Sequence, residues 1–300
     1  MKCLITADWH ISGTRPRCRA DEDWIGVQEK DIEAVWQIAK EHRVDAVWIL
    51  GDLFDTSRVA TEAVNLILRE FEKAPCPVYT LCGNHDLPYH SFDLLERSSI
   101  GTVLHKFPML ATDPITAVVA YPFGKEPEYG ALNEYMKANA MHTWITHQLT
   151  FPDEKSRPMQ NIGVLAQELL DACPAASVIL TGDYHHGYIY VAPDGRRVIT
   201  PGCLNIQDAD MKDYRPQVVI FDTFDLSAEA VKLPIHGKVE TAYLEHEHEL
   251  ANMKEKFVAS LSAGAITMKS FPEALNEAMP TLPEGVRKVL EEVKEGMSAA

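Results

Sequence analysis

The chain of 300 residues is long enough for one large α/β domain, or for one domain with a small appendage. Hydrophobic residues make up 46% of it, which suffices for a sizeable core, but no apolar run approaches the roughly 18 residues that a membrane helix needs. The formal net charge of −16 argues against binding of nucleic acid through a broad basic surface, so a polyanionic substrate would need a local positive site such as bound metal.

The N-terminal stretch and the cysteines favour a cytoplasmic protein without membrane attachment. Asp8 and His10 interrupt the short apolar run at the start of the chain, so that run is not a signal peptide. The six cysteines show no paired spacing, and Cys3, Cys82 and Cys203 sit in or beside apolar runs. We therefore expect buried free thiols in a reducing cytosol.

Short β-rich runs alternate with helical patterns along the first 225 residues. Apolar residues at helical spacing predict helices over 32–42 and 60–71. The predicted strands lie at 2–7, 44–50, 78–82, 117–122, 142–146, 177–181 and 217–223, and a predicted hairpin over 188–200 turns at Pro193, Asp194 and Gly195. This alternation predicts an α/β fold built from layers.

The composition and the spacing of apolar residues change after Leu233 and Pro234. Residues 240–300 are charged and helical in pattern. Their apolar residues form two stripes, one of Leu250, Met253, Phe257, Val258 and Leu261, the other of Val286, Val289, Leu290 and Val293. We therefore divide the chain into a main domain, residues 1–235, and a helical appendage, residues 236–300, which is either a small cap or a docking element for a partner.

Polar residues with metal-binding side chains follow five of the predicted strands. They are Asp8 and His10, Asp52 with Asp55, Asn84 with His85 and Asp86, His147, and Asp183 with His185. Because ligands of α/β sheets gather outside the carboxyl ends of the strands, we expect these side chains to form one site. Mixed carboxylate, imidazole and amide ligands suit Mn, Fe or Zn, and the lack of sulfur argues against a structural zinc site. A glycine precedes Asp52, Asn84 and Asp183, and it permits a tight turn from strand to loop.

These motifs, in this order, resemble those of the calcineurin-like metallophosphoesterases. Within that family, "GDLFDTSR", "CGNHD" and "THQLT" are most similar to the SbcD-type DNA exonucleases. The stretches "TRPRCRADEDW" and "TPGCLNIQDADMKDYRPQVVIFD" also resemble phage-encoded members. The resemblance covers roughly residues 1–235 and implies an α/β sandwich of two sheets. Each motif alone is weak, but five in order at strand ends are a strong signal.

The resemblance implies a role for each matching residue. One metal ion would be bound by Asp8, His10 and His185, a second by Asn84, His147 and Asp183, and Asp52 would bridge the two. His85 would bind no metal but would stabilise the transition state or protonate the leaving oxygen. Asp86 would orient His85, and Asp55 would support the ligands. Two divalent ions about 4 Å apart clamp the attacking and leaving oxygens of a displacement, and an imidazole titrates near neutral pH, so the chemistry agrees with these roles.

The last motif departs from the pattern of the nuclease family, which usually has Gly-His-x-His where this chain has Gly-Asp-Tyr-His. Asp183 therefore takes a position that a histidine usually fills. Three aspartate ligands would oppose two divalent ions with three negative charges instead of two, so we expect a less positive site. His186 has no counterpart in the motif, and it is either a substrate contact or a support for a metal ligand.

Three arginines follow the first metal motif. Alternate residues of an extended loop share one side, so Arg15, Arg17 and Arg19 would point together toward a phosphate backbone. The alternative is a solvated loop whose arginines balance the acidic residues at 21–23. We weigh these two interpretations equally.

We expect a dinuclear metal-dependent phosphodiesterase, with DNA as the first substrate class and exonuclease or endonuclease action left open. Manganese is the expected metal, with Mg, Fe and Zn as alternatives. The rival function is a phosphatase or phosphodiesterase for a small molecule or nucleotide, which the acidic charge and the short tail favour. A scaffold without catalysis would be expected to lack His85 or a ligand, and none is missing. The expected partners are DNA, an ATPase subunit with a coiled coil as in the nuclease family, and a second copy of the chain, with no membrane.

Overall fold

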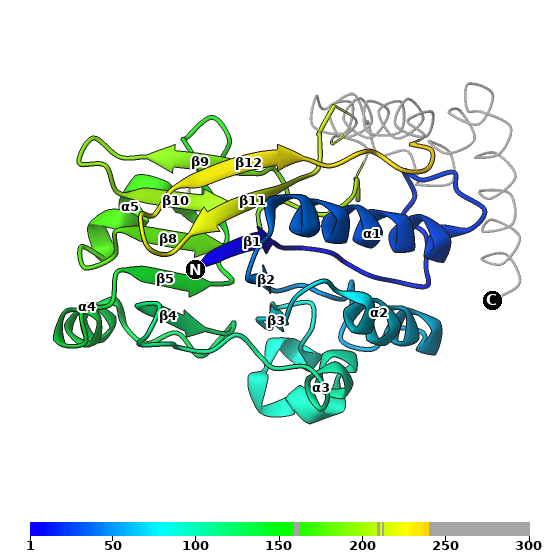
Figure 1. The fold of residues 1–300 in the computed structure, drawn as a ribbon, viewed down its shortest axis with the longest axis horizontal. Coiled ribbons are helices and arrows are strands. Elements are labelled where there is room, and N and C mark those ends of the chain that lie inside the picture. The colour runs from blue at the N-terminus through cyan, green and yellow to red at the C-terminus, as the bar shows by residue number, and fades with distance from the viewer. Residues whose placement is uncertain (159–161, 209–210, 212, 240–300) are drawn as a thin grey trace, which may run out of the picture. The chain divides into compact units, whose positions relative to one another are not determined.

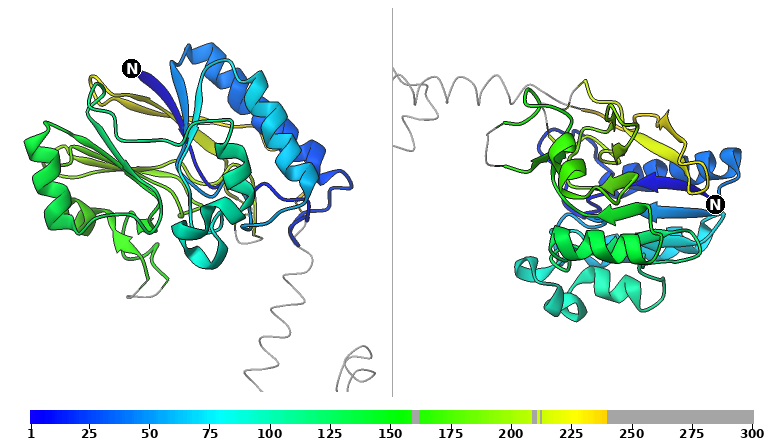
Figure 2. Two further views of the ribbon diagram at one scale, coloured as in Figure 1. Left: turned by 90° about the horizontal axis from the view of Figure 1, so that it is seen from below. Right: turned by 90° about the vertical axis from the view of Figure 1, so that its left-hand side faces the viewer.

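Two five-stranded β-sheets stack face to face and carry helices on their outer faces (Figure 1, Figure 2). The computed structural model describes residues 1–158, 162–208, 211 and 213–239. No helix among these residues is long and apolar enough to cross a membrane. The α/β sandwich of two sheets is confirmed. The predicted appendage lies outside the described residues from position 240 onward.

The first sheet holds the first three strands of the chain in parallel order. In space its strands are β12 (Ala228–Lys232), β11 (Gln217–Asp222), β1 (Lys2–Thr6), β2 (Ala46–Ile49) and β3 (Val78–Thr80). β1 pairs in parallel with β2 and antiparallel with β11, so that Leu4 lies between Val47 and Ile220. β1 therefore occupies the centre of this sheet although it opens the chain.

The second sheet has four parallel strands and one antiparallel edge. In space its strands are β4 (Val118–Tyr121), β5 (Thr143–Thr146), β8 (Val178–Thr181), β10 (Arg197–Thr200) and β9 (Tyr188–Val191). β9 and β10 form the predicted hairpin, whose turn contains Gly195 with φ of +88°. A further pair of short strands consists of β6 (Thr150–Phe151) and β7 (Val164–Leu165).

Helices cover both outer faces of the sandwich, as the left view of Figure 2 shows. The helices on the first sheet are α1 (Trp24–His42), α2 (Thr61–Lys73) and α3 (Ser99–Leu104), with the short 3₁₀ segments η1 (Pro88–His90) and η2 (Phe92–Arg97). Those on the second sheet are α4 (Tyr129–Ala138) and α5 (Ala166–Ala172). α1 begins where the Asp23 carboxylate accepts the backbone N–H of Gly26 at 2.8 Å, and it ends at Arg43, whose φ is +52°.

The alternation of apolar residues along the strands builds the layers. In β1, Cys3 and Ile5 pack into the layer between the two sheets, whereas Leu4 faces α1 and α2. Cys3, Cys82 and Cys203 are fully buried free thiols, as predicted. Because both faces of the parallel strands are covered, the strands read as nearly continuous apolar runs.

Candidate metal centre

The candidate ligands lie in loops at the carboxyl ends of β1, β2, β3, β5 and β8. The loops after β1 and β2 run side by side, because the Asp8 and His10 N–H groups donate to the carbonyl oxygens of Gly51 and Asp52 at 3.0 and 3.1 Å. The loop after β8 joins them, because the Asp183 N–H donates to Asp8 Oδ1 at 3.0 Å. Both sheets therefore contribute to one site.

Four of the candidate ligands have a left-handed backbone conformation, which is uncommon for residues other than glycine. The φ angles of Asp8, His10, Asp52 and Asp183 are +50°, +46°, +51° and +72°. Each such residue costs roughly 1–2 kcal/mol of conformational energy. Strain of this kind persists where the surrounding structure fixes a functional geometry, and here it coincides with the predicted site.

The glycines of the motifs provide room for the ligands. Gly51 has φ of +106°, which agrees with the predicted tight turn. The φ angles of Gly83 and Gly182 lie outside the left-handed region. Glycine is needed at these two positions because neighbouring atoms leave no room for a side chain. A Cβ at Gly83 would overlap the Asp52 carboxylate, and one at Gly182 would lie 2.6 Å from Nδ1 of His147.

One group of ligands gathers around His10. Its Nε2 lies 3.1 Å from Nε2 of His185 and 3.9 Å from Oδ2 of Asp52. Its Nδ1 lies 3.6 Å from Oδ1 of Asp55, so Asp55 is placed to support this imidazole. The group matches the pairing of His10 with His185 that the sequence predicts.

A second group gathers around His147, which is fully buried. Its Nδ1 lies 2.7 Å from the Leu50 carbonyl oxygen, so the proton belongs on Nδ1 and the lone pair on Nε2. Nε2 lies 3.0 Å from Oδ1 of Asn84 and 3.3 Å from Oδ2 of Asp52. A histidine fixed in this way through its other nitrogen is the usual arrangement of a metal ligand.

Asp52 is shared by the two groups. Donor atoms of Asp52, His10 and His85 lie within 4.8 Å of one another, and so do those of Asp52, Asp8 and His147. Asp8 thus lies nearer to the second group than predicted, with Oδ1 at 4.0 Å from Nδ1 of His147. The bridging position predicted for Asp52 is compatible with these distances.

Unpartnered polar atoms inside the site fit bound cations. Oδ2 of Asp8, Oδ2 of Asp52 and Nδ1 of His10 are buried and have no hydrogen-bond partner among the described residues. Buried carboxylate oxygens without a partner are costly unless a positive charge compensates them. Their chemistry, oxygen and imidazole nitrogen without sulfur, suits divalent metal ions.

Burial dominates the electrostatics of the ligands. It raises the pKa of Asp8 well above its usual value and lowers the pKa of His10 to about 3. Burial also disfavours charge on Asp52 and His147, but each stabilises the other, so the pKa of Asp52 falls and that of His147 rises. Burial therefore favours the neutral forms of Asp8 and His10, whereas the contact between Asp52 and His147 favours the charged forms of both.

His85 is exposed at the mouth of the site. Its backbone N–H donates to Oδ1 of Asp52 at 2.9 Å, and its Nδ1 lies 2.8 Å from the Asp55 carbonyl oxygen. Its ring stands at 86° to the ring of His10, with centroids 4.9 Å apart. The loop thus holds the imidazole beside the ligands with Nε2 on the side away from Asp55.

The resemblance implies that Asp86 orients His85, and no hydrogen bond within the described chain joins its carboxylate to the His85 ring. Its carboxylate instead accepts the backbone N–H groups of Leu53, Phe54 and Gly83 at 3.2, 2.9 and 2.9 Å. Asp86 is completely buried, so its oxygens must find donors, and the nearest are these amides. Asp86 therefore joins the two loops that carry Asp52 and His85.

The interpretation that Arg15, Arg17 and Arg19 point to one side of their loop is wrong. Arg15 and Arg17 are exposed, but Arg19 is only 2% exposed. Its guanidinium donates to Asp21 at 2.9 Å and to the His236 carbonyl oxygen at 2.7 Å, and it lies over the Trp24 ring. A buried guanidinium requires such partners, and they turn it away from the surface.

His186 lies outside the ligand groups. It is exposed, and its ring contacts the rings of Tyr184 and Tyr214 with centroids 5.6 and 5.5 Å away. These contacts join His186 to two tyrosine rings, and both of its predicted roles, a substrate contact or a support for a metal ligand, stay predictions.

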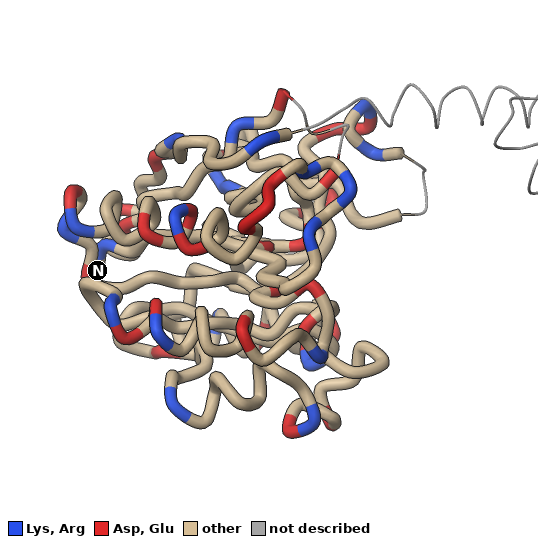
Figure 3. The backbone as a smooth tube through the Cα atoms, turned by 90° about the vertical axis from the view of Figure 1, so that its right-hand side faces the viewer, with Lys and Arg blue, Asp and Glu red and all other residues tan. Residues whose placement is uncertain are grey.

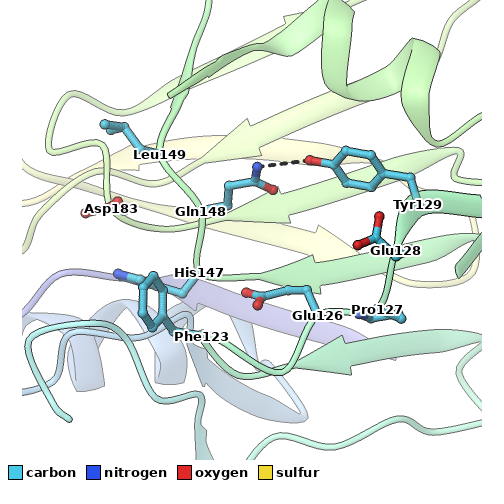
Figure 4. Close-up of a pocket in the computed structure, with 9 residues that line it drawn as sticks. All are labelled: Phe123, Glu126, Pro127, Glu128, Tyr129, His147, Gln148, Leu149 and Asp183. Carbon is cyan, nitrogen blue, oxygen red and sulfur yellow. Dashed lines mark hydrogen bonds between the residues drawn. The ribbon is translucent and has the colours of Figure 1, made fainter. Parts of the chain in front are cut away.

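A pocket beside His147 and Asp183 was not foreseen from the sequence (Figure 4). Its remaining lining residues are Phe123, Glu126, Pro127, Glu128, Tyr129, Gln148 and Leu149. They follow β4 and β5, just as the ligands follow their strands. That position was the available signal, because Gln148 directly follows a predicted ligand.

Comparisons with known proteins agree with this geometry. Residues 1–152 match the family model described as calcineurin-like phosphoesterase. The chain is 26% identical over 161 residues to exonuclease subunit 1 of Enterobacteria phage T4, which covers 49% of the chain and 45% of that relative. It is 29% identical over 198 residues to the DNA double-strand break repair protein Mre11 of Methanosarcina acetivorans, which covers 62% of the chain and 30% of that relative.

The chain thus spans less than half the length of these two relatives. Among solved structures, a dimetal phosphatase from Danio rerio aligns with a TM-score of 0.48 at 12% identity, over 80% of this chain and 97% of that one. The family model matches half of the chain and includes the loops that carry Asp8, Asp52 and His147. The chain belongs to the calcineurin-like phosphoesterase family.

Proposed function

We propose that this protein hydrolyses phosphodiester bonds of DNA, as an exonuclease or endonuclease, with two divalent metal ions of which manganese is the first candidate. The observation that carries the proposal is the convergence of two ligand groups on Asp52, built from loops of both sheets. The relatives named as an exonuclease subunit and a break-repair protein support DNA as the substrate.

We assign a metal-binding role to each candidate ligand. His10, His185 and Asp8 would hold one ion, Asn84, His147 and Asp183 the other, and Asp52 both. Held by these residues, two divalent ions would stabilise the attacking and leaving oxygens of an in-line displacement and would lower the pKa of water. Leu50 keeps the His147 proton on Nδ1, which leaves Nε2 free to act as a ligand.

His85 supplies the proton chemistry. With Nδ1–H donated to the Asp55 carbonyl oxygen, a protonated ring presents its Nε2–H to the substrate side. It can then hydrogen-bond a phosphoryl oxygen or give its proton to the leaving oxygen. Asp86 acts at a distance by fixing the loop on which His85 stands.

The net charge of −16 favours a second candidate, a phosphodiesterase or phosphatase for a small molecule. Basic and acidic residues are interspersed on the side shown in Figure 3, and they form no broad basic face there. Binding of a long polyanion would then depend on the metal ions and on local cations such as Arg15 and Arg17. We propose DNA ahead of the small molecule because of the relatives.

A partner subunit is part of the proposal. The relatives from phage T4 and from Bacillus subtilis are each named as a subunit of an exonuclease or nuclease. We propose a coiled-coil ATPase as the partner, with the segment 236–300 as the docking element, and a second copy of the chain as a further partner.

One experiment tests the function and the role of His85. We expect purified protein with Mn²⁺ to cut linear duplex or single-stranded DNA faster than a chromogenic phosphodiester. His85→Ala should abolish cleavage yet retain the metal content of the parent, because His85 is not needed as a ligand. His105→Ala is the control, since His105 is exposed and pairs only with exposed Glu96.

The outcomes separate the alternatives. Cleavage of the chromogenic diester without cleavage of any DNA would support the small-molecule function. Loss of metal from His85→Ala, measured by elemental analysis after dialysis, would show that His85 is a ligand. Dialysis against an equal mixture of Mn²⁺, Mg²⁺, Fe²⁺ and Zn²⁺ tests the preference for manganese.

A further inference from the structure

The pocket beside His147 and Asp183 has a volume of about 320 Å³ and opens directly onto the metal centre (Figure 4). This volume lies within the range of pockets that hold small organic groups. Its walls come from the loop after β4, the start of α4 and the residues after β5. The predicted catalytic roles use only two of its residues, the metal ligands themselves.

The lining is acidic and aromatic. Glu126 and Glu128 contribute carboxylates, and Phe123 and Tyr129 contribute rings. Oε1 of Glu126 accepts the Thr146 hydroxyl at 3.0 Å, and this side chain makes no other hydrogen bond within the described residues. The Glu128 carboxylate makes no hydrogen bond or ion pair within that same part of the chain, although the backbone carbonyl oxygen of Glu128 accepts the Leu132 N–H at 3.0 Å. Carboxylate oxygens are therefore available to a ligand.

An amide completes the lining. Nε2 of Gln148 donates to the Tyr129 hydroxyl oxygen at 3.1 Å, drawn as the dashed line in Figure 4. This bond fixes the amide and leaves Oε1 of Gln148 as an acceptor. Acceptors thus outnumber donors around the pocket.

The charge of the pocket decides which part of a substrate enters it. No lysine or arginine among the described residues lines the pocket, whereas Glu126, Glu128 and Asp183 each bring a carboxylate. A phosphate group is repelled by these carboxylates and attracted by the neighbouring metal ions. The pocket therefore suits an uncharged group that donates hydrogen bonds and is attached to the phosphate under attack.

We propose that this pocket holds a nucleobase of the DNA next to the bond that is cut, and that it selects bases with amino groups. The proposal rests on DNA being the substrate. Carboxylates are acceptors only, so they pair with the amino groups of adenine, cytosine and guanine. Thymine has no amino group, and its two carbonyl oxygens would face carboxylates. The rings of Phe123 and Tyr129 provide apolar walls of the kind that hold extruded bases.

Occupation of the pocket restricts the form of DNA that can react. A base can reach it only when it is unpaired and out of the helical stack. The bond beside His147 is therefore cut at a frayed end or in a single strand. Cleavage in the interior of an intact duplex would first require the extrusion of a base.

The test uses single-stranded DNAs that differ only in their two terminal nucleotides, which are adenine, cytosine, guanine, thymine or an abasic unit. Release of the terminal nucleotide is measured with the full chain and Mn²⁺. We expect kcat/KM for the three amino-bearing ends to exceed that for thymine and abasic ends by about fivefold or more. In Glu126→Gln and Glu128→Gln the ratio of adenine to thymine should fall toward one, because an amide also donates to thymine.

The ratio within each variant cancels differences in metal loading and in the amount of folded protein. Glu134→Gln is the control, since Glu134 lies on α4 outside the pocket and should keep the parental ratio. Equal rates for all ends in the parent, or an unchanged ratio in both pocket variants, would overturn this inference while the proposed function stands. If no DNA is cut although the chromogenic diester is hydrolysed, the proposed function fails and the inference fails with it.

Discussion

The carboxylate of Asp86 holds three backbone N–H groups that belong to two ligand loops. Leu53 and Phe54 follow Asp52, and Gly83 precedes Asn84. Burial raises the pKa of Asp86 to about 7, because no solvent reaches its oxygens and the charge of Asp52 is near. The side chain thus sets the distance between two loops without touching the substrate.

Asp86→Ala should be strongly destabilising, because it leaves three buried N–H groups without acceptors. Each such group costs about 1–3 kcal/mol, so we expect a loss of roughly 3 kcal/mol or more in the free energy of unfolding. Asp86→Asn keeps one acceptor oxygen of the same shape and should lose less. Urea unfolding of both variants in the presence of chelator measures the effect. Equal stability of Asp86→Ala and the parent would contradict it.

Asp183 stands where the nuclease family usually has a histidine, and it lines the pocket as well as the metal centre. Asp183→Ala should lower metal occupancy and reduce activity at least tenfold, because one ligand is lost. Asp183→His should restore much of both with a changed order of metal preference. Elemental analysis and rates across a series of metals provide the measurement. Full activity of Asp183→Ala with every metal would show that Asp183 is only a turn residue.

Three of the parallel strands, β2, β3 and β8, are followed by a glycine at which a Cβ would overlap neighbouring atoms. Gly83→Ala would press a methyl group against the Asp52 carboxylate, so we expect loss of metal and of activity. Gly130→Ala is a matched control in α4, where a Cβ would meet nothing within 4 Å. It should be neutral or stabilising by up to about 1 kcal/mol. Similar metal content in the two variants would refute this role of Gly83.

The elements and ligand loops could be predicted because their signals are local. Alternation and apolar runs fix strands such as 44–50, and the polar residues that follow them fall at one edge of the sheets. The helices at Tyr129–Ala138 and Ala166–Ala172 and the strand at Ala228–Lys232 were not predicted, because they are short and weakly patterned.

Side-chain partners could not be predicted, because they depend on contacts between distant parts of the chain. The partner of Arg19 in the fold is the His236 carbonyl oxygen, 217 residues away in the sequence. Two of the three donors that hold Asp86, the N–H groups of Leu53 and Phe54, come from a loop more than 30 residues earlier. The spacing of the motifs therefore predicted which residues lie in the candidate site, but not which atoms form hydrogen bonds.

Contacts between residues far apart in the sequence fasten the last described segment to α1 and to the loop before it through a partly buried polar cluster. Asp31 on α1 is 4% exposed, and its Oδ1 lies 2.8 Å from Nδ1 of His236. Lys238 N–H donates to Asp21 at 2.7 Å. Residues 236–239, the first residues of the segment that we propose as the docking element, are thus anchored on the main domain.

This cluster makes stability depend on pH. Burial raises the pKa of Asp31 to about 7, although the hydrogen bond and charge of His236 oppose the shift. In the unfolded chain the pKa of an aspartate is about 3.9. Between about pH 4 and pH 7 the folded state keeps a proton that the unfolded state loses, so the contribution of Asp31 to the free energy of unfolding falls as pH rises.

Asp31→Asn stays neutral and keeps an acceptor for His236. Its Tm should therefore exceed that of the parent by roughly 3 °C or more at pH 8, since 1 kcal/mol shifts Tm by about that much in a domain of this size. The difference in Tm between Asp31→Asn and the parent should be small near pH 4, should increase up to about pH 7 and should then stay constant. Thermal unfolding across this range is the measurement. A difference that is the same at pH 4 and pH 8 would contradict the assignment.

The central place of β1 has a consequence for the growing chain at the ribosome. β2 is synthesised soon after β1 and can pair with it early. The other neighbour of β1 is β11, where Lys2 pairs with Asp222. β11 is synthesised only after the last loop that carries proposed ligands. Until then one edge of an apolar strand stays open, and such edges invite aggregation. A fragment that stops before residue 217 would therefore contain every proposed ligand and still lack β11 and β12 of the first sheet. Synthesis must run nearly to the end of the main domain before the sheet that carries Asp8, Asp52 and Asn84 is complete.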